Sequence, residues 1–363
     1  MRESAKPLPI GEKGPGLNLR DELAAMVGSK DVSILIVNWN SKDYLRKCLA
    51  SIYRETRGLE FEVIVVDNAS WDGAAELVAT EFPGVKFIQS DANLGFARAN
   101  NLAFGHSVGK AVLLLNPDTE VLGSAIATML DTLRSLSDAG IVGCKNLHSD
   151  LTVQTYSIRR FPTILEEVLA MEWIRNAWPK CRLWSIEVLF DKQTAPIRVD
   201  AVTGACQMIW REVYEAVDGL STKYFMYSED LEISASAMAK GWKTYYAGNA
   251  EIIHHGGKSS QASGRGDRWV SFMQSRAMWQ FHRTWRGKGY AGLYRLTIGV
   301  VSLVWVTALV VMWPFLLALS KKDAAERAWG SRTGALQWSL GFERPAVRDG
   351  SAPAPAVAAD QRQ

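Results

Sequence analysis

The sequence predicts an α/β fold in which a mostly parallel β-sheet is covered by helices on both faces, followed by a hydrophobic C-terminal helical segment. Short apolar runs alternate with helical patterns through the first hundred or so residues, and this alternation requires right-handed crossovers between parallel strands. Near the C-terminus, a run of 24 residues, Leu296–Leu319, contains no charged side chain. The 363 residues, 48% of them hydrophobic, suffice for one large domain with appendages.

The first half of the predicted sheet begins with the apolar run Val32–Val37, which is typical of a fully buried strand. A helix follows over Asp43–Arg54, where Leu45, Cys48 and Leu49 fall on one helical face. The other elements of this half, in order, are strands at Phe61–Val66, Val85–Gln89 and Ala111–Leu115 and helices at Gly73–Thr80 and Phe96–His106. Together they predict a Rossmann-like nucleotide-binding half.

The pattern is less regular after Asn116. Residues 155–200 indicate mainly helix and loop. The elements expected around them are helices at Leu122–Leu136 and Asp230–Lys240, and strands at Ile141–Cys144, Val199–Val202, Gln207–Trp210, Thr244–Ala247 and Glu251–His254.

The C-terminal run Leu296–Leu319 is long enough for a helix to cross a hydrocarbon core of about 30 Å. Pro314 also permits a kink or a re-entrant turn, so membrane contact is predicted and spanning is left open. Upstream, basic residues and tryptophans suit an anionic headgroup region, and their bias predicts the cytoplasmic face of the inner membrane. We divide the chain into a flexible lead-in without a signal peptide (1–30), a catalytic-type domain (31–262), a basic juxtamembrane region (263–295), the apolar segment (296–319) and a tail with a disordered end (320–363).

Charge and cysteine content exclude several classes of protein. The formal net charge of +3 is too small to indicate nucleic acid as a partner. The four cysteines are widely separated and include no CxxC pair, so neither a zinc site nor a disulfide framework is indicated, and a reducing cytosol fits.

Polar residues follow each strand of the first half, and ligands bind at the carboxyl ends of strands in such sheets. Taken singly, each of these side chains suits a turn or a helix cap as well as a ligand. Their concentration along one edge favours a binding site, and they are Asn38, Asn40, Asp67, Asn68, Asp72, Asn93, Asn100, Asn116 and Asp118.

Three local features carry the chemistry. Asp118, after Asn116-Pro117, presents a carboxylate suited to Mg²⁺ or Mn²⁺ at the end of an apolar strand. The cluster Ser228-Glu229-Asp230 has two interpretations: an N-cap followed by acids in the first helical turn, or a site for a general base. His254 begins a glycine-rich loop in which Lys258 is placed to face phosphate.

The chain resembles the inverting glycosyltransferases of family 2, which have a GT-A fold, and within them the rhamnosyltransferase-like branch. The resemblance covers about residues 32–260 and rests on seven short motifs in the correct order: VNWNS (37–41), VVDNASWDG (65–73), NLGFARANN (93–101), LLLNPDT (113–119), VTGAC (202–206), FMYSEDLE (225–232) and HHGGKSS (254–260).

The resemblance implies a role for several of these residues. Asp67 would hold the nucleotide base, with Asn38 and Asp72 nearby, and the other polar residues of the edge and Lys258 would complete the donor site. Asp118 corresponds to the metal-binding aspartate, and His254 to a histidine near the metal and the diphosphate. Asp230 corresponds to the catalytic base, with Glu229 supporting it. Two positions depart from the family pattern: Glu232 replaces a second aspartate and Ser236 an arginine.

The expected activity is therefore metal-dependent transfer of a sugar to an acceptor hydroxyl. The donor expected from the branch is deoxythymidine-diphospho-rhamnose, with a uridine-diphosphate sugar second, and the expected acceptor is a polyprenyl-linked saccharide. A non-catalytic membrane scaffold is one alternative. A nucleotidyltransferase is the other, but VNWNS lacks the glycine-rich phosphate loop that such an enzyme would carry after its first strand.

Overall fold

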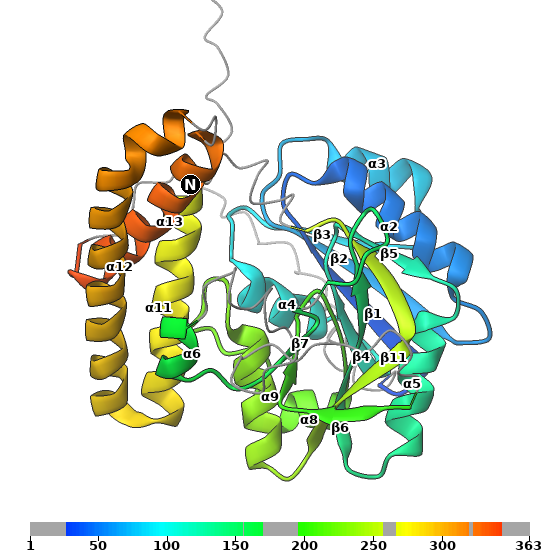
Figure 1. Ribbon diagram of the computed structural model, residues 1–363. Helices are drawn as coiled ribbons and strands as arrows, with labels where there is room; N and C mark the ends of the chain where they lie inside the picture. Colours follow the sequence, from blue (N-terminus) through cyan, green and yellow to red (C-terminus); the bar gives the residue numbers. More distant parts are fainter. Residues whose placement is uncertain (1–26, 155, 170–194, 257–265, 319–321, 343–363) are drawn as a thin grey trace, which may run out of the picture.

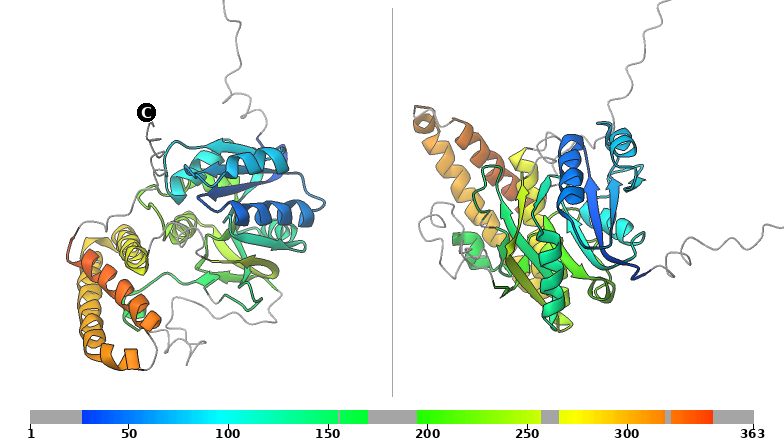
Figure 2. Two further views of the ribbon diagram at one scale, coloured as in Figure 1. Left: turned by 90° about the horizontal axis from the view of Figure 1, so that it is seen from above. Right: turned by 90° about the vertical axis from the view of Figure 1, so that its right-hand side faces the viewer.

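The computed structural model describes residues 27–154, 156–169, 195–256, 266–318 and 322–342. An α/β half built around one large sheet lies beside three long helices from the C-terminal part of the chain (Figure 1). The two further views in Figure 2 also show these helices packed together at one side of the α/β half. The predicted fold class is confirmed.

The N-terminal part of the sheet is parallel. Its strands are β1 (Lys30–Asn38), β2 (Phe61–Asp67), β3 (Lys86–Gln89) and β4 (Gly109–Leu115), in the spatial order β3-β2-β1-β4. The connecting helices are α2 (Lys42–Glu55), α3 (Ala74–Glu81) and α4 (Phe96–Phe104). All the carboxyl ends of these strands therefore meet at one edge of the sheet.

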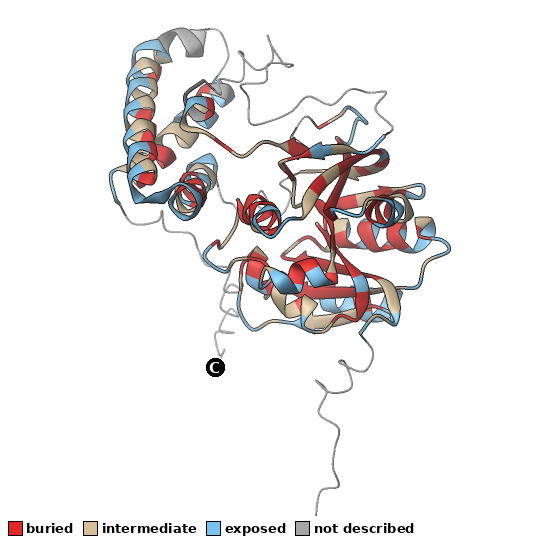
Figure 3. Ribbon diagram, turned by 90° about the horizontal axis from the view of Figure 1, so that it is seen from below, coloured by how far each residue is buried: buried red, intermediate tan, exposed pale blue. Residues whose placement is uncertain are grey.

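Alternate residues of each strand face opposite sides, and helices cover both. On one face Ile34 and Ile36 of β1 belong to a buried cluster with residues of α2, α3 and α5 (Ala125–Ser135). On the other, Leu35 belongs to a cluster with residues of α4, α8 (Arg211–Ala216) and α9 (Glu229–Ala239). Figure 3 shows the resulting core in red along the middle of the sheet.

The sheet continues with mixed pairing beyond β4, in the order β4-β10-β6-β11-β5. Strand β10 (Cys206–Trp210) is antiparallel to β4 and to β6 (Ala139–Leu147), and β5 (Thr119–Leu122) is antiparallel to the end of β11 (Lys243–His254). A short strand β8 (Ile197–Val199) pairs with β11, while β7 (Ile158–Arg159) and β9 (Ala201–Val202) form a separate two-stranded sheet. The antiparallel pairing of β5 with β11 brings the end of β11 next to the residues that follow β4.

Three elements differ from their predicted form. The helix expected over Leu122–Leu136 begins at Ala125, because residues 119–122 pair as β5. The two strands expected at residues 244–247 and 251–254 are one strand, interrupted by an irregularity between Ala247 and Glu251. The strand expected over residues 199–202 is divided between β8 and β9, which belong to different sheets.

The C-terminal helices are α11 (Asp267–Trp285), α12 (Gly287–Ala318) and α13 (Lys322–Ser339), and a short helix α6 (Ile164–Leu169) packs beside α12. Arg286 separates α11 from α12, and Gly287, the first residue of α12, has a left-handed φ of 88°. The apolar run predicted to start at Leu296 is the later part of α12, and α13 lies within the segment that the sequence indicated as a tail. Among the described residues, the stretch Gly287–Trp313 is long and apolar enough to cross a membrane by length and composition.

Candidate active site

Asn38 and Asp67 end the neighbouring parallel strands β1 and β2 and face each other in register. The Asn38 Nδ2 donates to Asp67 Oδ1 at 2.7 Å, and both side chains are buried. The other oxygen of Asp67 accepts from the backbone N–H of Ser70 at 2.8 Å and from Gln89 Nε2 at 2.9 Å. Gln89 was not predicted, although β3 places it directly beside Asp67. The structure thus holds Asp67 as an oriented carboxylate at the sheet edge.

Asp72 and Asn40 shape the loops beside this pair. One oxygen of Asp72 accepts from the backbone N–H of Lys42 at 2.7 Å, and the other from that of Ala74 at 3.2 Å. These amides begin α2 and α3, so Asp72 caps two helices at once. Asn40 accepts from the backbone N–H of Trp71 at 3.0 Å. Both side chains therefore have structural partners in the absence of any ligand.

The loop that leads into α4 contains three further predicted residues. Asn68 Nδ2 donates to the carbonyl of Gly95 at 3.3 Å, and Asn93 Oδ1 accepts from the Gly95 N–H at 3.0 Å. Asn100 lies within α4 and donates to the carbonyl of Phe96 at 3.0 Å. Among the described residues, nothing donates to the buried Asn100 Oδ1. These bonds hold the α4 loop next to the Asn38–Asp67 pair.

Asp118 and His254 come together where β5 pairs with the end of β11. His254 Nε2 lies 3.5 Å from Asp118 Oδ1 and 3.5 Å from Asn116 Nδ2. The other ring nitrogen, Nδ1, lies 3.1 Å from Gln154 Oε1, while Gln154 Nε2 donates to the His254 carbonyl at 2.5 Å. Asp118, His254 and Gln154 are all buried. Gln154 lies between the strand predicted at Ile141–Cys144 and the region 155–200, in no predicted element, so no pattern pointed to it.

The amide of Gln154 determines the tautomer of His254. Because its oxygen faces Nδ1, that nitrogen carries the proton, and Nε2 presents a lone pair toward Asp118. A lone pair and a carboxylate oxygen 3.5 Å apart form a donor set that a divalent cation fits. The described residues contain no group of three or more His, Cys, Asp or Glu side chains suited to a metal. A cation here would therefore take its remaining ligands from water and from a bound phosphate.

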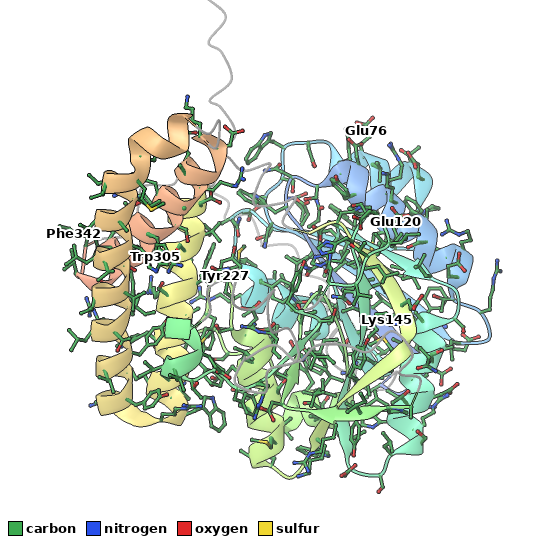
Figure 4. All side chains as sticks on the ribbon, viewed as in Figure 1. Glu76, Glu120, Lys145, Tyr227, Trp305 and Phe342 are labelled. Atoms are coloured by element: carbon green, nitrogen blue, oxygen red, sulfur yellow. The ribbon has the colours of Figure 1, made fainter. Side chains whose placement is uncertain are left out.

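The segment before α9 has an unusual backbone. Tyr227 and Ser228 both have left-handed φ values, 72° and 64°, which non-glycine residues adopt at a cost. Ser228 occupies the N-cap position of α9, as one interpretation of the sequence predicted, but its side chain makes no capping hydrogen bond. The strained turn leads directly into α9, whose first residues are Glu229 and Asp230. Tyr227 lies between the large sheet and the C-terminal helices (Figure 4).

Asp230 is held by donors from three directions. Arg159 Nη1 lies 3.3 Å from each carboxylate oxygen, Gly204 N–H donates at 3.2 Å and Leu231 N–H at 2.9 Å. A Cβ added at Gly204 would lie 3.4 Å from the Asp230 Cβ. Arg159 lies outside every motif that the sequence analysis used, and the small β7–β9 sheet positions it. These donors fix the orientation of the carboxylate.

Glu229 is buried beside Asp230, and its Oε2 has no hydrogen-bond partner among the described residues. Burial, followed by the charge of Asp230, raises the pKa of Glu229 to about 8. The side chain is therefore largely protonated at neutral pH, which prevents two adjacent buried charges.

The raised pKa of Glu229 predicts a pH-dependent stability. Because it lies above the ordinary value of 4.5, the folded state binds more protons than the unfolded state between pH 4.5 and about 8, and stability falls as pH rises through this window. We expect Glu229→Gln to raise Tm by roughly 5 °C at pH 8.5 and to change it little at pH 4.5. Thermal unfolding at both pH values tests this, and a difference independent of pH would contradict it.

Glu232, where the family pattern has an aspartate, connects α9 to the C-terminal helices. Its Oε2 accepts from Tyr224 Oη at 2.9 Å and from Trp285 Nε1, at the end of α11, at 2.8 Å. The second departure, Ser236, lies further along α9 and is partly exposed. Lys258 lies outside the described residues.

Comparison with known proteins shows the family and the fold. The family model described as "Glycosyl transferase family 2" matches residues 33–217. The N-acetylglucosaminyl-diphospho-decaprenol L-rhamnosyltransferase of Mycobacterium tuberculosis is 27% identical over 237 residues, covering 61% of this chain and 75% of that protein. Rhamnosyltransferase WbbL of Escherichia coli is 24% identical, covering 62% of this chain and 83% of that protein.

Among solved structures, the mannosyltransferase PcManGT of Pyrobaculum calidifontis, in complex with GDP-Man and Mn²⁺, superposes with a TM-score of 0.53 at 16% identity. The match covers 86% of this chain and 88% of that one. The fold and the polar edge of the sheet thus define a glycosyltransferase with a GT-A fold. The chain belongs to glycosyl transferase family 2.

Proposed function

We propose that this enzyme transfers a sugar, with inversion at the anomeric carbon, from a nucleoside-diphosphate sugar to a hydroxyl of a lipid-linked saccharide. One observation carries the proposal: the Asp118–His254 pair and the Asp230 carboxylate are joined by a short hydrogen-bonded path. The backbone N–H of Asn116 donates to the carbonyl of Ala205 at 2.9 Å, and the adjacent Gly204 donates to Asp230. The residues proposed to bind the leaving group and the proposed base are therefore attached to neighbouring backbone segments.

In this mechanism Asp67 would bind the nucleotide base, and Asp118 and His254 would hold Mn²⁺ or Mg²⁺. The cation would neutralise charge on the departing nucleoside diphosphate. Asp230, oriented by Arg159 and Gly204, would accept the proton of the acceptor hydroxyl as that oxygen attacks the anomeric carbon. Glu229, protonated beside it, would add no competing charge. One base and one displacement give inversion.

The relatives support a narrower choice of substrates. Two of them are named as rhamnosyltransferases, and one of these names specifies an acceptor, N-acetylglucosaminyl-diphospho-decaprenol. We therefore propose deoxythymidine-diphospho-rhamnose as donor, a uridine-diphosphate sugar as the second choice, and a polyprenyl-diphosphate-linked saccharide as acceptor. The apolar α12 and the basic residues before it support a place at the cytoplasmic face of the inner membrane.

A panel of donors tests the proposal. Each nucleotide sugar is added to the detergent-purified full chain with Mn²⁺, with Mg²⁺ or with a chelator, and Tm is measured. A ligand that binds only the folded state raises Tm by mass action, so we expect stabilisation by one donor, dependent on the cation. The same donor should then support transfer to a polyprenyl-diphosphate saccharide. Stabilisation by no donor under any condition would favour a non-catalytic scaffold and refute the proposal.

A further inference from the structure

Helix α12 carries an exposed apolar surface along one side. Between Leu296 and Val311, six aliphatic side chains are each more than half exposed and recur at helical spacing; we call them the α12 stripe: Leu296, Val300, Leu303, Val304, Val310 and Val311. The outward side of α12 carries exposed residues in Figure 3, while its buried residues face the neighbouring helices. At 1.5 Å per residue the stripe is about 22 Å long. An aliphatic surface of this length is unusual on a protein surrounded by water.

The opposite side of α12 packs against α13, which runs antiparallel to it. Arg295 Nε donates to the carbonyl of Ser339 at 2.9 Å near one end of the pair. Near the middle, the Arg332 guanidinium lies 5.4 Å from the centre of the Trp305 ring, and further along the rings of Trp313 and Trp329 are 6.2 Å apart. Trp305 is labelled on the bundle in Figure 4. Contacts therefore hold α12 along most of its length.

These contacts are incompatible with α12 crossing a bilayer while the bundle is intact. If α12 spanned, Trp305 would lie near the bilayer centre, and the Arg332 that packs on it would be there too. The exposed charges of α11, such as Arg276, would also enter hydrocarbon, where charged side chains are strongly disfavoured. Trp285 further joins α11 to Glu232 of the catalytic half, so the bundle is attached to a folded domain.

We propose that α12 lies in the plane of the membrane surface, with the stripe among the lipid acyl chains, and that the chain does not cross the bilayer. Exposed cations are found at both ends of α12, with Arg286 and Lys288 at its start and Lys322 after its end. They complement anionic headgroups on a single side of the membrane. This inference rests on the membrane association proposed above and specifies its geometry.

Labelling of single cysteines tests the topology. Cys48, Cys144 and Cys206 are buried, so Cys181→Ser gives a background in which Lys288→Cys, Lys322→Cys or Glu76→Cys is introduced into the full chain. A membrane-impermeant maleimide is added to sealed, inside-out vesicles from the expression host. We expect positions 288 and 322 to react as readily as position 76 of the catalytic half. Reaction at 288 or 322 only after detergent would show that α12 crosses, and would overturn the proposal.

Binding to phosphatidylglycerol-containing vesicles tests the role of the stripe. We expect Val304→Lys and Leu303→Lys each to weaken binding about tenfold, because an apolar contact is lost. Gln274→Lys, at an exposed site on α11, is the matched control and should bind at least as well as the unchanged protein. Equal vesicle binding by the stripe variants and the control would refute the proposal. The proposal would also be refuted if light scattering without lipid showed a dimer that the stripe substitutions dissociate. If the unchanged protein bound no vesicles, the proposed membrane association itself would fail, whereas donor binding would be unaffected.

Discussion

Asp230→Asn is expected to lower kcat by about 10³-fold while leaving donor binding intact. Asparagine keeps the shape of the side chain but cannot accept the hydroxyl proton, and general bases of this kind contribute roughly 10²- to 10⁴-fold. Arg159 and the Gly204 N–H, which now bond both carboxylate oxygens, would still hold the amide oxygen in place. Transfer at saturating donor and acceptor measures the effect, and Tm with and without donor measures binding.

Asp131→Asn is the matched control for this substitution. It makes the same chemical change at an exposed position on α5, where the side chain is 75% exposed and lies 4.0 Å from Arg134. We expect its kcat to be unchanged. If Asp230→Asn retained most of the activity of the unchanged enzyme, Asp230 would not be the base, and the mechanism would have to place proton transfer elsewhere.

The sequence predicts the edge of the sheet at which the candidate site lies, because the formation of each strand depends on local sequence. An apolar run such as VSILIV is typical of a strand buried on both faces, and parallel strands place the residues that follow them at one edge of the sheet. Asn38 and Asp67, at the ends of neighbouring parallel strands, therefore face each other in register as expected. For the same reason, the first half of the sheet was predicted more accurately than the second, where strands pair across large separations in the chain.

The residues that orient His254 and Asp230 could not be predicted from the sequence. Gln154 meets His254 across a separation of 100 residues, and Arg159 meets Asp230 across 71. Both come from a stretch without clear periodicity, and nothing local distinguishes them from surface residues. Asp72 lies within a family motif, and the structure adds that both of its oxygens accept from the first amides of two helices, which the motif alone does not show.

The C-terminal helices illustrate another limit. Composition identifies α12 as apolar, but it cannot tell which side of the helix is covered, and the choice between spanning and lying on a membrane depends on that. The answer comes from α13, whose Arg332 and Trp329 contact α12 and whose sequence alone suggested only a tail. Partner helices therefore decide what a hydrophobic segment can do.

Asp118→Ala is expected to lower kcat/KM by about 10³-fold and to abolish any cation-dependent rise in Tm with donor. The substitution removes the only carboxylate that the structure places against His254 Nε2 within the described residues, so a cation would lose its charged protein ligand. Metal-dependent donor binding should then be indistinguishable from binding in the presence of chelator.

Two further variants determine whether this loss reflects the metal site itself. Glu120→Gln neutralises a carboxylate two residues away that faces His255 at 2.9 Å, and it should leave cation-dependent binding unchanged. Gln154→Leu leaves both Asp118 and His254 in place but removes the amide that fixes the imidazole tautomer, so an intermediate loss of about 10- to 100-fold in metal affinity is expected. Persistence of cation-dependent stabilisation in Asp118→Ala would place the cation elsewhere. A cation between Asp118 and His254 requires that cation-dependent stabilisation be lost in Asp118→Ala, partly lost in Gln154→Leu and retained in Glu120→Gln. A general disturbance of the β5–β11 edge would instead affect all three variants.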